Sequence, residues 1–232
     1  PEVSSFANRH FYNGQLCPVP LPHQTSTLPY NTYDKASALQ ALIATHRTAF
    51  INCPMPKQEE RFKTNSHEAQ LCAMVVKNII ELYRTNGIPY DAHQTIGIIS
   101  PFRGQGALIR NELSLLDMEE YTQHISIDTV ERYQGSQRDI IIYCTTITSP
   151  SQMELIVEAI DPTSPIVNQP IDRKLNVALT RARMQLFVIG IPQVLDTDCN
   201  YRALNNELPQ YLHPTAEYSN QSRKKKQKNS GR

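Results

Sequence analysis

Residues 139–146 read DIIIYCTT, an apolar run in which polar residues do not alternate with apolar ones. Strands that are buried on both faces of a parallel sheet have this pattern, whereas half-exposed strands alternate. Working outward from this run, we find further short segments of the same kind and expect them to be strands of the same sheet. They are residues 49–53 (AFINC), 95–100 (TIGIIS), 124–129 (HISIDT) and 185–190 (QLFVIG).

Segments with helical periodicity separate these apolar runs. Residues 66–86 repeat apolar side chains every three to four positions and close with Asn86-Gly87, which predicts an amphipathic helix. Two further helices are expected over residues 105–116 and 173–183. Strands that alternate with helices indicate one three-layer α/β domain with a mainly parallel sheet.

In a sheet of this kind, ligands bind beyond the carboxyl ends of the strands. The loops that follow Ser100, Thr129 and Thr146 are therefore the ones in which we expect functional side chains.

Composition shifts divide the chain into regions around this domain. Residues 1–48, interrupted by four prolines, are expected to be an irregular N-terminal segment, and residues 49–195 the main domain. A Pro-rich stretch over residues 149–170 is an insertion that could be a partner-binding loop, a lid or a spacer. Residues 196–218 are expected to form a helical extension, and residues 219–232 a basic disordered tail.

The overall charge is a property of this tail. The chain has 232 residues, 40% hydrophobic and 19% charged, with a net charge of +1. The tail carries six of the 23 Lys and Arg residues, which leaves 17 basic against 22 acidic residues in the remainder. Net charge is thus weak evidence for nucleic-acid binding, and the tail is either a polyanion-binding arm or a solvated end.

Several classes of protein are disfavoured by simple absences in the sequence. No apolar run approaches the ~18 residues that a membrane span needs, and we expect neither a membrane partner nor a signal peptide. The five cysteines include no CxxC pair, which favours a reducing, cytoplasmic location without disulfides. The histidines show no metal-ligand spacing, so no metal held by side chains alone is expected. The first residue is proline, which suggests either a piece of a longer protein or a processed chain.

The segment after the 95–100 run carries side chains suited to a nucleic-acid strand. A serine, an aromatic ring, an arginine and a glutamine at a strand end can contact a phosphate, stack on a base and hydrogen-bond a sugar. The alternative is an ordinary strand-to-helix turn. The candidate residues are Ser100, Pro101, Phe102, Arg103 and Gln105.

A compact polar loop follows the 124–129 run. About ten residues join two strands, too few for an ordinary crossover helix, and Gly135 would allow a close backbone approach to a ligand. The alternative is a tight surface connection. The candidate residues are Thr129, Arg132, Gln134, Gly135 and Gln137.

The expected helix over residues 173–183 ends with two arginines. Arg181 and Arg183 would lie about 200° apart on a helix, so at most one of them easily enters a single site. The alternative is a pair of surface arginines. The sequence has no GxxxxGK[ST] loop and no acidic pair at a strand end that would hold Mg²⁺, so this chain alone is not expected to hydrolyse ATP.

Taken in order, three segments resemble motifs IV, V and VI of the C-terminal motor domain of superfamily 1 helicases. The branch that they resemble holds the 5′→3′ DNA replication helicase–nucleases and the RNA-decay helicases. The segments are IGIISPFRGQ (residues 96–105), IDTVERYQGSQRDIII (127–142) and LNVALTRARMQLFVIG (175–190). The opening PEVSSFANRHFYNGQL also resembles the start of that domain, so the resemblance covers residues 1–195.

The resemblance implies a RecA-like domain of the P-loop NTPase type that lacks its own P-loop. Such a domain closes on ATP together with an N-terminal RecA-like domain, which brings the P-loop and the Mg²⁺ site. It implies that Arg181 is a catalytic arginine finger and that Gly135, Gln137, Arg181 and Arg183 lie at the nucleotide. Arg183 would also make a structural or interdomain contact. Single-stranded DNA would be held by residues Ser100, Pro101, Phe102, Arg103, Gln105, Thr129, Arg132 and Gln134.

The function implied is the C-terminal half of an ATP-dependent DNA helicase acting in DNA repair, inactive as an ATPase when isolated. An RNA helicase of the same architecture and a non-motor RecA-like binding module are the alternatives. Two departures from the motifs bear on this choice. The position of Gln137 is usually glutamate in this branch, and the tyrosine–arginine motif that should precede Pro1 is missing.

Overall fold

The computed structural model describes residues 2–17, 21–22, 26–56, 63–133, 135–157 and 172–212, without the side chains of Glu2 and Arg173. The described residues form one six-stranded sheet in the order β3-β2-β4-β5-β1-β6, and every neighbouring pair is parallel. The prediction of a three-layer α/β domain with a parallel sheet is confirmed. The strands are β1 (Thr48–Asn52), β2 (Ile96–Ile99), β3 (Ser126–Asp128), β4 (Arg138–Cys144), β5 (Ala182–Gly190) and β6 (Gln210–Leu212).

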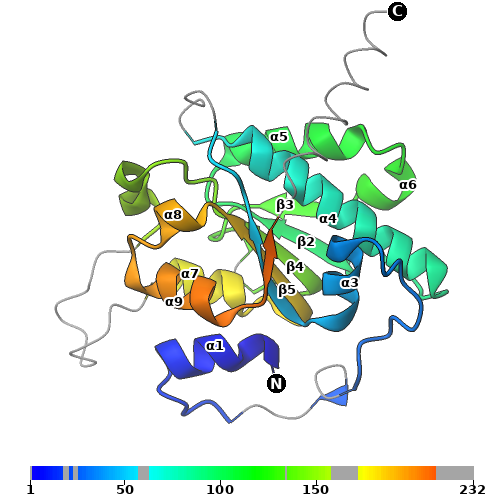
Figure 1. Ribbon diagram of the computed structural model, residues 1–232, viewed down its shortest axis with the longest axis horizontal. Coiled ribbons are helices and arrows are strands. Elements are labelled where there is room, and N and C mark those ends of the chain that lie inside the picture. Colours follow the sequence, from blue (N-terminus) through cyan, green and yellow to red (C-terminus); the bar gives the residue numbers. More distant parts are fainter. Residues whose placement is uncertain are drawn as a thin grey trace, which may run out of the picture.

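Helices cover both faces of the sheet, as Figure 1 shows. One face carries α3 (Ala38–Thr45), α4 (Ser66–Thr85), α5 (Arg103–Ser114) and α6 (Glu119–Thr122). The other carries α1 (Glu2–Phe11), α7 (Arg173–Leu179), α8 (Pro192–Leu195) and α9 (Cys199–Glu207), and a short 3₁₀ helix spans Pro150–Leu155. Crossovers between parallel strands are right-handed, so helices change face where the chain reverses its direction across the sheet. That reversal comes after β3.

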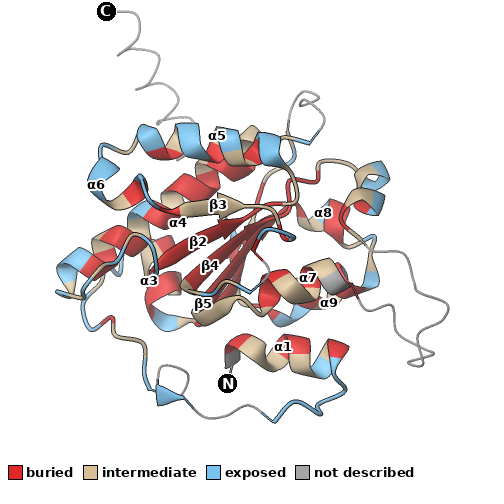
Figure 2. Cartoon of the chain, turned by 180° about the vertical axis from the view of Figure 1, so that it is seen from behind, coloured by how far each residue is buried: buried red, intermediate tan, exposed pale blue. Residues whose placement is uncertain are grey.

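The centre of the sheet is buried from both sides (Figure 2). The apolar residues of β2, β4 and β5 are almost fully shielded, which explains why their sequences do not alternate. Helix α4 is the main cover of one face, and the side chain of Asn65 caps its start by accepting a hydrogen bond from Glu68 N. None of the helices in the described part of the chain has the length and apolar character to span a membrane.

The first 48 residues are more regular than expected, because α1 and α3 lie within them. The prolines that suggested an irregular segment lie between these two helices. Val3, Phe6 and Ala7, spaced as one helix face, are buried against the rest of the domain, and Phe11 is buried with them.

The end of the expected helix over residues 173–183 also differs from the prediction. Helix α7 stops at Leu179, and β5 begins at Ala182, three residues before the expected strand. Within residues 196–218, α9 is followed by the edge strand β6. Most of the 149–170 insertion, the end of the extension after Leu212 and the basic tail lie outside the described residues.

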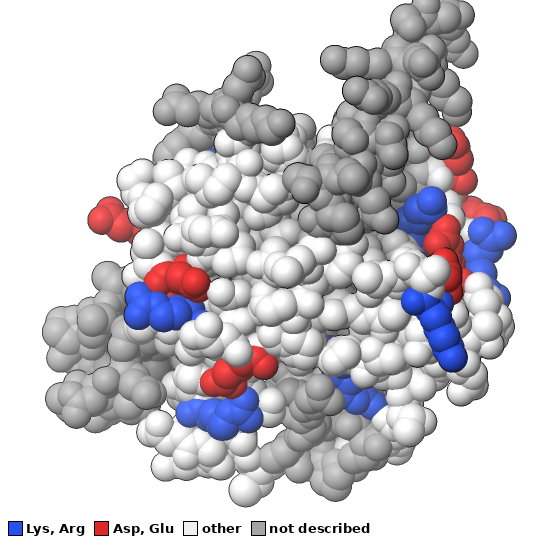
Figure 3. All heavy atoms as spheres, in the orientation of Figure 1, with Lys and Arg blue, Asp and Glu red and all other residues white. Residues whose placement is uncertain are grey.

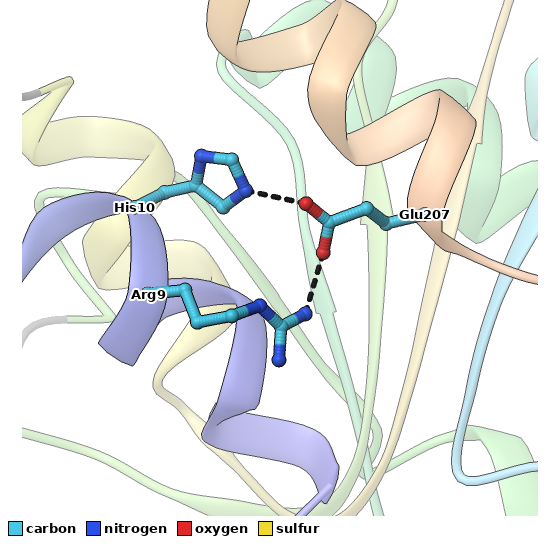
Figure 4. Close-up of polar contacts among 3 residues, drawn as sticks. All are labelled: Arg9, His10 and Glu207. Atoms are coloured by element: carbon cyan, nitrogen blue, oxygen red, sulfur yellow. Dashed lines mark hydrogen bonds and ion pairs between the residues drawn. The ribbon is translucent and has the colours of Figure 1, made fainter. Parts of the chain in front are cut away.

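Helix α1 is tied to the domain through α9 and α7. Both carboxylate oxygens of Glu207 are engaged at 2.5 Å, Oε2 by Arg9 Nη2 and Oε1 by His10 Nε2 (Figure 4). The His10 ring also stacks on Phe6, and Asn176 Nδ2 donates to Tyr12 Oη at 2.8 Å. The N-terminal helix is therefore fixed to the layer that carries α7.

Acid should loosen α1 by protonating Glu207. Partial burial acts to raise the pKa of Glu207, but the bonds from His10 and Arg9 outweigh it and hold the pKa below its usual value. A carboxylate whose pKa is depressed in the folded state stabilises the fold at pH values above the unfolded-state pKa of about 4.3. This stabilisation is lost as the pH falls through the lower pKa of the folded state. Hydrogen-exchange protection of α1 should fall there before that of α4. A Glu207→Gln variant that keeps the same pH dependence would contradict this assignment.

Candidate functional site

A groove lies at the edge of the sheet where β2 and β3 end, as expected for a parallel sheet. It has a volume of about 300 Å³. Five of the eight residues proposed to hold a nucleic-acid strand line it: Ser100, Phe102, Arg103, Thr129 and Arg132. They come from two loops that are far apart in sequence and are brought together because β2 pairs with β3.

Two charged residues of this groove were missed in the sequence. Arg110 lies two helical turns after Arg103 on α5, and Asp128 is the last residue of β3. The Arg110 guanidinium donates to Ile125 O at 2.9 Å, and burial lowers its pKa. Asp128 Oδ1 lies 3.5 Å from Nη1 of Arg132, which is 66% exposed. The groove is therefore lined by three arginines and one aspartate.

The wall of the groove at Ser100 is held by a buried hydrogen-bond network. The Ser100 and Thr146 hydroxyls are 3.1 Å apart, and the Glu68 carboxylate accepts from Thr146 N at 2.8 Å and Thr145 Oγ1 at 3.2 Å. Thr146 has a φ of 68°, a strained conformation for a β-branched residue, which these contacts stabilise. The loop after β4 thus supports the groove, and Ser100 itself is buried.

Two of the predicted contact residues do not line the groove, and a third is not among the described residues. Gln105 is fully buried, and its amide accepts from Asn65 N and donates to Asn65 O, both at 2.8 Å. It therefore holds the start of α4 and has no exposed surface for a strand. Pro101 lies between two lining residues but is not itself part of the lining, and Gln134 lies outside the described residues.

The four candidate nucleotide residues gather at the opposite edge of the sheet, where β4 and β5 begin. Arg138 pairs with Ala182, and Arg138 N donates to Arg181 O at 3.1 Å, so Gln137 and Arg181 are neighbours across this edge. This is the amino edge rather than the carboxyl edge expected for the loop after Thr129. The reason for Arg181 is that α7 joins the carboxyl end of β4 to the amino end of β5. It therefore runs antiparallel to the strands and ends at the amino edge.

Neither arginine projects from a helix, so the helical angle between them is not relevant. Arg181 lies in the turn after α7, and its guanidinium donates to Val177 O and Thr180 Oγ1, both at 3.1 Å. Arg183 belongs to β5, and its Nη1 lies 3.6 Å from Asp139 Oδ1. Both guanidiniums remain partly exposed and can reach an anion at this edge.

One loop joins the two edges, and we call residues 129–137 the crossing loop. Because β3 and β4 are both parallel to β2, the end of β3 and the start of β4 lie at opposite edges. The crossing loop therefore runs the length of the sheet beside α7, where Glu131 Oε1 lies 3.6 Å from Lys174 Nζ. Near its end Gly135 has a φ of 84°, a conformation that favours glycine.

The surface charge gives no single basic face in the view of Figure 3. Basic and acidic side chains lie there in small mixed groups.

The sequence matches the AAA domain family over residues 1–193. Regulator of nonsense transcripts 1 of Dictyostelium discoideum is 29% identical over 88% of this chain and 14% of that protein. DNA replication ATP-dependent helicase/nuclease JHS1 of Arabidopsis thaliana is 25% identical over 83% of this chain and 13% of that protein. DNA polymerase alpha-associated DNA helicase A of Saccharomyces cerevisiae is 35% identical over 52% of this chain and 15% of that protein. The chain thus spans a small part of each relative.

Proposed function

Because this chain belongs to the AAA domain family and has named helicases among its relatives, we propose that it is the second motor domain of a longer superfamily 1 helicase. These relatives confirm the resemblance of its motifs to superfamily 1 helicases, so it is a helicase-family domain. One observation carries the proposal. The two groups of motif residues gather at opposite edges of one sheet and are joined by the crossing loop.

At the amino edge we assign Arg181 to the transferring γ-phosphoryl group of ATP, which is the substrate of the proposed reaction. Two partly exposed guanidiniums at one edge fit a polyphosphate. Arg181 must leave two hydrogen bonds to neutral acceptors to reach it, each worth about 1.5–3 kcal/mol because the donor is charged, and bidentate bonds to an ionised phosphate are stronger. Arg183 would contact the first RecA-like domain, and Gly135 and Gln137 would face the nucleotide sugar.

Mg²⁺, when bound, neutralises charge that develops on the phosphate oxygens. We assign its ligands, and the P-loop, to the first motor domain. This chain alone would then form only part of the nucleotide site and would not turn over ATP.

At the carboxyl edge the groove would hold single-stranded nucleic acid. Arg103 and Arg132 are exposed and suited to phosphates, and the partly buried Phe102 ring offers a surface for a base. The ring lies 5.7 Å from Lys63 Nζ, which adds a cation beside it. We propose DNA as the strand, with RNA as the alternative, since one relative is named for nonsense transcripts and two for DNA.

We place the protein in the reducing cytoplasm and in DNA repair or replication. The free thiols of Cys53, Cys72 and Cys144 are buried, which suits a reducing compartment.

A non-motor binding module is the second candidate, and one residue favours it. Gln137 stands where the branch usually has glutamate, so any step that needs a carboxylate at this position is missing. Arg181 argues the other way, because a module that only binds nucleic acid has no use for an arginine at a γ-phosphate.

The test is steady-state ATP hydrolysis by the complete protein encoded by the reading frame that holds this chain. We expect turnover that single-stranded DNA stimulates and that RNA stimulates less, and no turnover by residues 1–232 alone. Stimulation by RNA in preference would reassign the strand. A reading frame without a P-loop, or a complete protein without stimulated turnover, would favour the non-motor module.

A further inference from the structure

One side chain anchors the crossing loop to the sheet at its midpoint. Tyr133 is only 2% exposed, although most of its neighbours in the loop lie on the surface. Its hydroxyl bonds to the Ser126 hydroxyl, on the strand that leads into the groove. The ring is therefore a closely packed contact between the groove and the arginine edge.

The Tyr133 ring packs closely against the sheet. A Cβ atom at Gly97 of β2 would lie 1.9 Å from Tyr133 Oη and 2.7 Å from Arg138 Cγ. Glycine at this position thus lets the crossing loop lie directly against the strand that it crosses. Burial raises the pKa of Tyr133, so its hydroxyl stays protonated and can donate at neutral pH.

From Tyr133, contacts lead on to the arginine edge. The Arg138 guanidinium lies 5.7 Å from the centre of the Tyr133 ring, and Arg138 Nη1 donates to Gln137 O at 2.8 Å. The backbone of Arg138 then donates to Arg181 O. On the other side, Tyr133 directly follows Arg132, and Ser126 lies two residues before Asp128, both in the groove lining.

We propose that Tyr133 is a positioning residue through which a strand in the groove controls the placement of Arg138 and Arg181, and hence ATP turnover. This rests on the proposed motor function. A strand that draws Arg132 or Asp128 toward its phosphates or sugars displaces one end of the crossing loop. Because Tyr133 is buried and bonded at the middle, the displacement is carried to Arg138 instead of being absorbed by a flexible loop.

The test removes one oxygen atom from the complete protein. Tyr133→Phe keeps the ring packed against the sheet and removes the bond to Ser126. We expect basal ATP turnover and affinity for single-stranded DNA to stay near wild type, while the ratio of DNA-stimulated to basal turnover falls about 5-fold or more, the usual size of such couplings. Ser126→Ala removes the other hydroxyl group of the same hydrogen bond, at a residue more exposed than Tyr133. It should lower the same ratio.

Tyr143→Phe is the matched control. Tyr143 is also buried in this sheet, and its hydroxyl lies 2.9 Å from the hydroxyl of Tyr201, a residue of α9 and not of the crossing loop. This variant should keep full stimulation. Full stimulation in both Tyr133→Phe and Ser126→Ala, or an equal loss in Tyr143→Phe, overturns the proposal. A wild-type protein that DNA does not stimulate overturns the proposed function itself, which separates the two failures.

Discussion

We expect Arg181→Ala in the complete protein to lower ATP turnover about 10³-fold or more, the effect of removing an arginine that stabilises a phosphoryl-transfer transition state. ATP affinity falls much less, because the interaction forms mainly in the transition state. The structure adds a condition, since Arg181 is bonded to Val177 O and Thr180 Oγ1 at the end of α7. On the proposed function, the guanidinium would exchange these two bonds for the γ-phosphoryl group when the first domain closes on ATP.

Two further variants make this result specific. Arg202→Ala removes an exposed guanidinium from α9, whose Nε bonds Asp196 O, and should leave turnover unchanged. Arg181→Lys keeps the charge but loses the planar fork, and should recover only a small part of the rate. Turnover is measured under saturating ATP, and ATP affinity by equilibrium binding. Near-normal turnover in Arg181→Ala would remove this residue from the chemistry.

The sequence predicted the central elements of the fold closely because their signals are local. The helix expected over residues 66–86 is Ser66–Thr85, and the strand expected over 95–100 is Ile96–Ile99. The predicted C-terminal end of α7 was wrong because a tertiary contact ends the helix early. Pairing of Ala182 with Arg138 of β4 draws the chain into β5 before the helical periodicity ends.

The site was predicted in part, and the misses have physical causes. Gln105 shares a helix face with the buried residues Ile109 and Leu113, a spacing that indicated the core and not the groove. The support of Ser100 by Glu68 and Thr146 joins three distant segments, so no local pattern could reveal it. The sequence analysis assigned no edge of the sheet to Arg181 and Arg183, although a helix that joins two parallel strands must end at their amino edge.

Neutralising Arg103 and Arg132, two of the exposed arginines of the groove, should weaken single-strand binding strongly. In Arg103→Gln/Arg132→Gln the complete protein loses two phosphate contacts, and each contact to a single strand contributes about 0.7 to the salt slope. At ~0.1 M salt this corresponds to about 25-fold lower affinity, and the slope of log affinity against log salt becomes shallower by about 1.4.

Fluorescence anisotropy with labelled oligo-dT and oligo-U over a salt series measures both quantities. Lys35→Gln/Arg202→Gln removes the same charge from exposed sites outside the groove, and should change neither the affinity nor the slope beyond a small long-range effect. A slope that stays the same in the groove variant would mean that the strand binds elsewhere. If the slope falls while the preference for dT over U stays constant, Arg103 and Arg132 contact phosphates alone. Discrimination between DNA and RNA then rests with other residues of the groove lining.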